Sequence, residues 1–131
     1  MTERQIKKSY DEWNKQSSYD FETAQAMFSS GRYIYAIFFC HLAVEKLLKG
    51  IFLKESKKEP EKIHNLNYFI EKLDLKIDTE KRDFIDNLND LSVPVRYPDE
   101  LEKLLKDFDN KETAEILKKT GELLTWLRSM I

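Results

Sequence analysis

The chain has 131 residues, a length that suits one domain. Three glycines and three prolines are too few for a fold built from many hairpins, and 41% hydrophobic residues exclude an acidic disordered tail. The 22 basic and 24 acidic side chains give a net charge of −2, which excludes a strongly basic nucleic-acid clamp but not a local basic patch.

The first predicted helix covers about residues 4–29. Apolar and small side chains recur along it every three or four residues, as one buried face requires: Trp13, Ser17, Phe21, Ala24 and Phe28. Asp20 lies beside this stripe, where a carboxylate calls for a cationic partner. Gly31 is a suitable stop, because glycine accepts the left-handed conformation that many helix ends need.

The second predicted helix, residues 33–54, is apolar nearly all round and is therefore expected in the centre of the molecule. Its one consistent polar line consists of His41, Glu45 and Lys49, spaced four residues apart. A charged linker over residues 55–62 follows this helix.

The remaining chain predicts three or four further helices. A short one covers residues 66–73, and a longer one runs from a cap at Asp78 to about residue 91. Residues 92–99 contain two prolines and are expected to break the helix. Residues 101–108 suit a helical turn or two, and a last helix runs to residue 131 from a capping box formed by Asp109 and Glu112.

Together these elements predict an all-α fold, an antiparallel up-and-down bundle of four long helices plus one or two short ones, in a single domain over residues 1–131. The single Cys40 cannot form a disulfide within the chain and, inside an apolar run, is expected to be inert. Neither a secretory signal nor an apolar stretch long enough for a membrane span is present, so a cytoplasmic protein is expected.

Several kinds of site are excluded by the residues that they need. The three glycines are isolated, which excludes a P-loop and a dinucleotide fingerprint. Two histidines and one widely spaced cysteine cannot close a structural zinc site, and no paired Glu-x-x-His motif is present. No cofactor and no metal are therefore predicted.

Three segments could carry a function. His41, Glu45 and Lys49 form either a solvated stripe with an i,i+4 ion pair or a polar line that faces a groove or a partner. In the segment Arg96-Tyr97-Pro98-Asp99, the prolines at 94 and 98 brace Arg96, which could bind a carboxylate or phosphate, or could pair with Asp20. In His64-Asn65-Leu66, Asn65 is expected to cap the short helix and Leu66 to enter the core.

Taken in order, these segments resemble the HEPN domain family. His64-Asn65-Leu66 is similar to the family's His-Asp-Leu step, with Asn in place of the usual Asp, and Arg96-Tyr97-Pro98-Asp99 matches the RYPD box of one branch. The resemblance spans nearly the whole chain. In the first two predicted helices it is carried by Asp20, Ala24, Gly31, Tyr33, Ala36, Phe38, His41, Ala43, Glu45, Lys46 and Lys49.

The resemblance implies a helical bundle that is usually a homodimer and is often encoded beside a minimal nucleotidyltransferase in toxin–antitoxin-like pairs. Many HEPN proteins are metal-independent ribonucleases, in which an Arg-x4–6-His motif supplies an arginine for phosphate charge and a histidine for proton transfer. Counted from Arg96, that histidine would fall on Leu101, Glu102 or Lys103. The usual ribonuclease mechanism is therefore not expected.

The leading hypothesis is a noncatalytic HEPN-type domain that binds a nucleotide, an RNA phosphate or a minimal nucleotidyltransferase. Two alternatives stay open: a metal-independent endoribonuclease that uses Arg96 with His41 or His64, and a structural homodimerisation module. The candidate ligand-binding or interface residues are Arg96, Tyr97, Asp99, His41, Glu45, Lys49 and Asp20, with Arg96 and Lys49 as the phosphate contacts.

Overall fold

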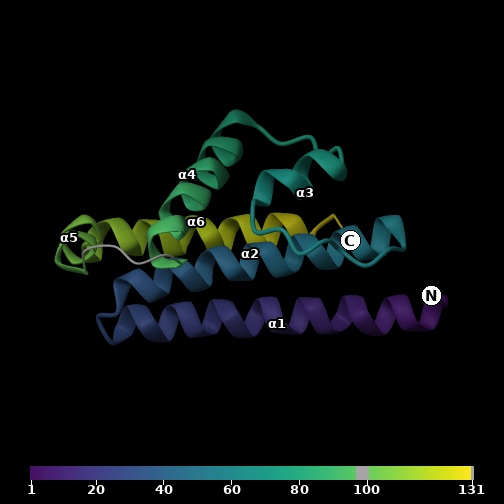
Figure 1. The fold of residues 1–131 in the computed structure, drawn as a ribbon, viewed down its shortest axis with the longest axis horizontal. Helices are drawn as coiled ribbons and strands as arrows, with labels where there is room; N and C mark the ends of the chain where they lie inside the picture. Colours follow the sequence, from purple (N-terminus) through teal and green to yellow (C-terminus); the bar gives the residue numbers. More distant parts are fainter. Residues whose placement is uncertain (97–100, 131) are drawn as a thin grey trace.

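The computed structural model describes residues 1–96 and 101–130, with the side chain of Arg96 left out. The described residues form six helices and no strand, which confirms the all-α prediction. Four helices are long and two are short, as expected (Figure 1). They are α1 (Glu3–Ser29), α2 (Tyr33–Ser56), α3 (Leu66–Lys72), α4 (Thr79–Arg96), α5 (Leu101–Asp107) and α6 (Asn110–Arg128).

Helices α1 and α2 form a long antiparallel hairpin. A capping box fixes the start of α1, since the Thr2 hydroxyl accepts from the Gln5 backbone N–H and the Gln5 side chain accepts from the Thr2 N–H. At the other end Gly31 has a φ of 77°, the left-handed conformation expected there. The chain therefore reverses within a few residues and lays α2 along α1.

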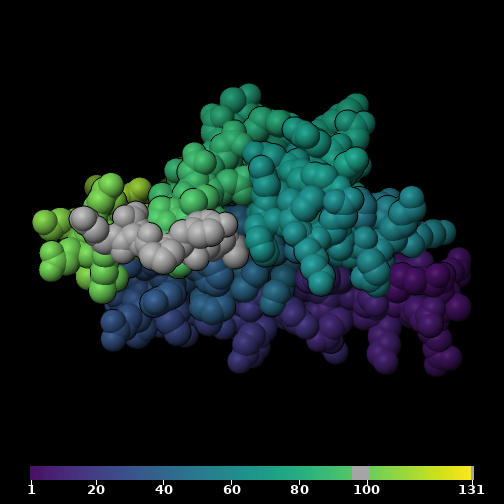
Figure 2. Space-filling model, viewed as in Figure 1, coloured from purple at the N-terminus to yellow at the C-terminus, as the bar shows by residue number. Residues whose placement is uncertain are grey.

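Helix α2 occupies the centre of the molecule, as its apolar composition predicts. All five other helices pack against it, and Figure 2 shows the segment from α3 to α4 covering much of α2 on one side, with α1 beneath it. Its fully buried side chains include Ile37, Leu47 and Leu48. Polar side chains on α2 consequently have to be satisfied by the neighbouring helices.

The short helices begin and end close to their predicted positions. Asn65 caps α3 by accepting the backbone N–H of Asn67 at 3.0 Å, and Leu66 is fully buried, as predicted. Asp109 caps the long helix α6 in the same way, by accepting the N–H of Glu112 at 2.8 Å.

Within the described residues, the chain has no helix of the length and apolarity that a membrane crossing needs.

Helix α4 departs from the prediction at its C-terminal end. A break over residues 92–99 was expected, but α4 continues through Pro94 to Arg96. Pro94 lies in the last turn of α4. Because it has no N–H, it removes one backbone hydrogen bond, to the carbonyl of Asp90, and Asp90 is exposed, so water can replace the missing donor. Leu91 and Val95 pack against the core on this turn, so tertiary packing outweighs the local preference against helix.

The first testable prediction concerns Gly50, where α2 approaches α1. A Cβ added at Gly50 would lie 2.9 Å from Cβ of Trp13, too close for two carbons that are both fixed to helical backbone. Gly50→Ala should therefore lower the free energy of unfolding by about 1–2 kcal/mol despite the higher helix propensity of alanine. Urea denaturation followed by circular dichroism measures this change.

Gly121→Ala on α6 is the matched control. There an added Cβ would meet the tip of the Phe21 ring at 3.2 Å, and a ring tip can shift more easily than a backbone-attached atom. This variant should be neutral or slightly stabilised. Equal losses at the two glycines would contradict the close-approach argument.

Candidate functional site

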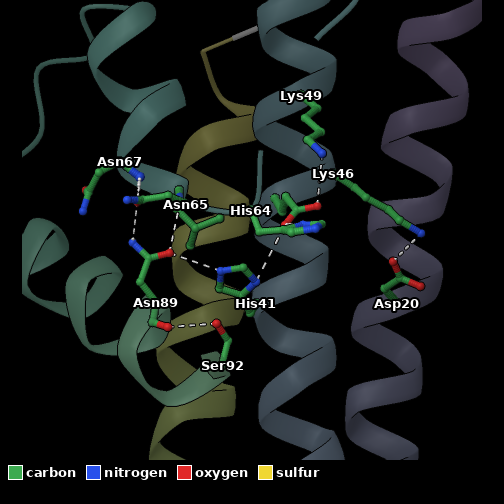
Figure 3. A network of polar contacts seen from close by, with 11 residues as sticks. Asp20, His41, Lys46, Lys49, His64, Asn65, Asn67, Asn89 and Ser92 are labelled. Carbon is green, nitrogen blue, oxygen red and sulfur yellow. Dashed lines mark hydrogen bonds and ion pairs between the residues drawn. The ribbon is translucent and has the colours of Figure 1, made fainter. Parts of the chain in front are cut away.

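A network of polar side chains joins α2, α3 and α4 (Figure 3). It brings together two segments that the sequence singled out separately, the polar line of α2 and the His64-Asn65-Leu66 step. Two acceptor groups organise it, the carboxylate of Glu45 and the side-chain amide of Asn89. Each is contacted from more than one helix or loop, so the network fixes how α3 and α4 sit on α2.

The Glu45 carboxylate accepts from two sides. His64 Nδ1 lies 3.0 Å from Oε1, and because a carboxylate only accepts hydrogen bonds, the imidazole donates. Lys49 Nζ donates to Oε2 at 3.3 Å and lies about 6 Å from the ring centroids of Trp13 and Phe69. His41 Nδ1 is 3.9 Å from Oε1. One buried carboxylate is thus surrounded by nitrogen groups from α2 and the loop before α3.

The Asn89 amide links the same region to α4. Its Oδ1 accepts the backbone N–H of Leu66 at 3.0 Å and lies 3.2 Å from His41 Nε2, which therefore carries the hydrogen. Its Nδ2 donates to Asn65 Oδ1 at 3.1 Å. Ser92 donates to the backbone carbonyl of Asn89 at 2.8 Å. The α3 cap, the buried histidine and α4 consequently depend on one side chain.

Burial rules out a solvated stripe on α2. The exposed fractions of His41, Glu45 and Lys49 are 1%, 3% and 7%. The line lies inside the molecule against α4 and the loop before α3, so it is neither the solvated stripe nor a line that faces an open groove, and the predicted Glu45–Lys49 pair is present. Lys49 is already neutralised by Glu45, which makes it a poor phosphate contact. His64, with its side chain 58% exposed, is where the network reaches solvent.

Asp20 has the cationic partner that its position required, and Lys46 supplies it. Lys46 Nζ lies 2.8 Å from Asp20 Oδ2, and Asp20 is only 6% exposed. The predicted partner Arg96 ends α4, and its side chain is not described. The ion pair joins α1 to α2, and Figure 3 shows it on the side of α2 opposite to Asn65 and Asn89.

The Arg96-Tyr97-Pro98-Asp99 segment falls largely outside the described residues, since Tyr97, Pro98 and Asp99 are not described. The backbone of Arg96 is helical, and Arg96 follows Asn89 by seven residues. Two turns of helix separate positions on the same face, so Arg96 shares the register of Asn89 on α4. A pocket of about 280 Å³ is lined by residues on both sides of this segment, among them Val95 and Leu101.

Asn89 and Ser92 were missed by the sequence interpretation. They sit one turn apart on α4, next to the buried Ile85 and Leu88. That position was the available signal, because a polar residue beside an apolar stripe calls for a partner. The sequence pattern could not identify the partners of Asn89, because His41 and Leu66 are distant from it in sequence and approach it only in the folded structure.

Cys40 is buried, as predicted, and its environment decides its reactivity. Burial raises the pKa of its thiol to about 12, with a smaller opposing effect from the Thr120 hydroxyl. At pH 8 the thiol is therefore protonated and a poor nucleophile.

The second testable prediction follows from this pKa. Cys40 should not react with the thiol reagent dithionitrobenzoate at pH 8 in the folded protein, and should react fully in urea. Absorbance at the wavelength of the released thiolate reports the reaction. Rapid labelling of the folded protein would contradict a buried, protonated thiol.

The third prediction concerns Asn89. Asn89→Ala removes the acceptor of the Leu66 N–H and the partner of His41, so buried polar groups lose their hydrogen bonds. The free energy of unfolding should fall by about 2–3 kcal/mol. Asn87→Ala, an exposed position on the same helix, is the control and should change it by less than about 0.5 kcal/mol. Equal stability of the two variants in urea would show that the network does not support the fold.

The helical architecture is similar to that of two solved structures. The chain is similar to the crystal structure of TT1696 from Thermus thermophilus, with a TM-score of 0.77 at 19% identity over 93% of this chain and 98% of that one. It is also similar to the crystal structure of ST0689, an archaeal HEPN homologue, with a TM-score of 0.74 at 20% identity over 92% and 96% of the two chains. No curated protein matches. The model of the HEPN domain matches residues 10–130, and the chain therefore belongs to the HEPN domain family.

Proposed function

We propose that this HEPN domain is a noncatalytic binding module that takes the phosphate of a nucleotide or RNA beside the end of α4. The observation that carries the proposal is the pocket between the start of α2, the end of α4 and α5. Arg32, just before α2, and Tyr33 and Tyr35 on α2 line one side of it. Val95 and Leu101 line it from either side of the Arg96 segment. A guanidinium and two phenol rings beside an apolar wall suit a phosphate attached to a base.

The position of the pocket adds to this argument. Arg32 is exposed and precedes α2 without capping the helix through its side chain. Tyr33 is held by Asn110, whose Nδ2 donates to the phenol oxygen at 2.8 Å. Tyr35 is 54% exposed. A positive charge, a fixed ring and an open ring thus lie within four consecutive residues.

The noncatalytic part of the proposal rests on the two histidines. His41 is 1% exposed, and its ring nitrogens face Asn89 and Glu45. General acid–base catalysis needs a ring nitrogen within reach of the substrate, and a histidine enclosed in this way does not offer one. His64 is more open, and its Nδ1 donates to Glu45, which leaves Nε2 as the ring nitrogen that a substrate could reach. Burial therefore speaks against proton transfer by His41, and for His64 the cleavage test decides.

The fourth prediction tests binding directly. Isothermal titration with ATP should give saturable binding, and Arg32→Ala and Arg96→Ala should each weaken it about tenfold, because a charged hydrogen bond to phosphate contributes about 1.4 kcal/mol or more. Arg82→Ala is the control, since Arg82 is an exposed arginine near the opposite end of α4, and it should bind as wild type does.

The same proteins answer the competing interpretations. Absence of saturable binding to ATP, to GTP and to a short single-stranded RNA would overturn the proposal, as would equal affinity of the Arg96→Ala and wild-type proteins. RNA cleavage at neutral pH that is lost in His64→Gln or in His41→Gln would establish a ribonuclease in place of a noncatalytic module.

A further inference from the structure

A second open feature lies between α1 and α6. It shares no lining residue with the proposed phosphate pocket, and the two come together where Phe28 packs against Tyr33, with ring centroids 5.5 Å apart. The second feature is a groove of about 1000 Å³, several times larger than that pocket. Both helices pack on α2 and run in opposite directions (Figure 1). The groove is lined by residues of both helices. Its walls are mostly apolar or small side chains, including Phe21, Phe28, Ala114, Leu117, Gly121 and Trp126.

The groove has the length of a helix. Its α6 wall extends from Ala114 to Ser129 in steps of three and four residues, which at 1.5 Å per residue spans about 22 Å. Phe21, Phe28, Leu117 and Trp126 are all half-buried, so the wall remains open to a partner. A groove of this length between two helices accepts about four turns of a third helix, with its apolar residues at i, i+3, i+4 and i+7.

Arg128 closes one end of the groove. From α6 its Nε donates to Asn14 Oδ1 at 3.0 Å and its Nη2 to Ser18 Oγ at 3.0 Å, with Ser17 Oγ at 3.5 Å, so the guanidinium spans the gap to α1. All three partners are neutral, and within the described part of the chain no carboxylate pairs with Arg128. Partial burial lowers the pKa of Arg128, as expected for a cation without a countercharge.

The other charges of the groove compensate one another. Lys118 and Glu122 sit one turn apart on the α6 wall and carry opposite signs. Arg128 therefore supplies the net charge of the lining, and it does so at one end. Two of its five N–H donors have no acceptor among the described residues. A carboxylate placed there would gain a charge-assisted hydrogen bond without displacing an existing ion pair.

We infer that the α1–α6 groove binds an amphipathic helix of a partner protein, with an acidic side chain of that helix paired to Arg128. The apolar face of the helix covers Phe21, Leu117 and Trp126, and the acid sets its register along the groove. This site is separate from the phosphate pocket at the α2–α4 end and does not depend on the function proposed for it. The specificity lies in the acid, because apolar contact alone would accept a helix in several registers.

The test uses the whole protein and defined peptides. The probe is a fluorescein-labelled 16-residue peptide with leucine at i, i+3, i+4 and i+7 spacing, lysine and glutamine elsewhere, and one glutamate in its first turn. A second peptide carries glutamine in place of that glutamate. Fluorescence anisotropy with wild-type protein should show saturable binding of the glutamate peptide and about tenfold weaker binding of the glutamine peptide, the value of one charged hydrogen bond.

Three variants connect the affinity to the groove. Arg128→Gln should bind both peptides with equal, weakened affinity, and Leu117→Asp should bind neither. Arg82→Gln removes an arginine from α4 and should behave as wild type. Circular dichroism checks that each variant folds, and the comparison of the two peptides on wild-type protein needs no variant at all.

Three results would overturn the inference. The first is no saturable binding of the glutamate peptide, and the second is equal affinity of wild-type protein for the two peptides. The third is a dimer in sedimentation equilibrium that Leu117→Asp dissociates, because a second copy of the chain would then cover the groove. A loss of ATP binding in Arg32→Ala with unchanged peptide binding would separate the two sites.

Discussion

The carboxylate of Glu45 is buried near the middle of the most enclosed helix, and the surrounding structure compensates its charge. An ionised carboxylate without partners in such a place would cost several kcal/mol, so nearby groups have to approach it. Lys49 does so from the next turn of α2, and His64 does so from the loop that leads into α3. The position of that loop is therefore set by electrostatics as well as by the apolar contacts of Leu66.

From this point the constraint passes to α4 through neutral hydrogen bonds. His41 lies one turn before Glu45 on α2, and its Nε2–H is directed to Asn89. Asn89 also accepts the first N–H of α3, so the start of α3 and the middle of α4 share one amide. An amide suits this place because it donates and accepts at once, which neither a carboxylate nor an apolar side chain does. The positions of α3 and α4 on α2 thus depend on polar side chains of α2 itself, Glu45 and His41.

The sequence was sufficient for the helices and for the central place of α2, because apolar periodicity and caps such as Asn65 and Asp109 are local signals. It was insufficient for partners. Asp20 required a cation, and both Lys46 and Arg96 were available; the choice depends on how α1 packs on α2. The end of α4 was misplaced for a related reason, since the preference against helix before Pro94 is local, whereas the burial that outweighs it at Leu91 and Val95 comes from the tertiary fold.

The pocket at the start of α2 and the α1–α6 groove differ from the rest of the surface around α2, because the other helices cover α2 unevenly. Along the side that faces α3 and α4, His41, Glu45 and Lys49 already have polar partners, so a ligand would have to displace existing contacts. At the start of α2 and between α1 and α6, the surface instead offers cations that have no carboxylate partner among the described residues, Arg32 at one place and Arg128 at the other. A bundle of near-zero net charge attracts anionic groups only where single cations are left unpaired in this way. The buried network therefore supplies rigidity, and both binding sites that we propose lie where it leaves the surface of the bundle uncovered.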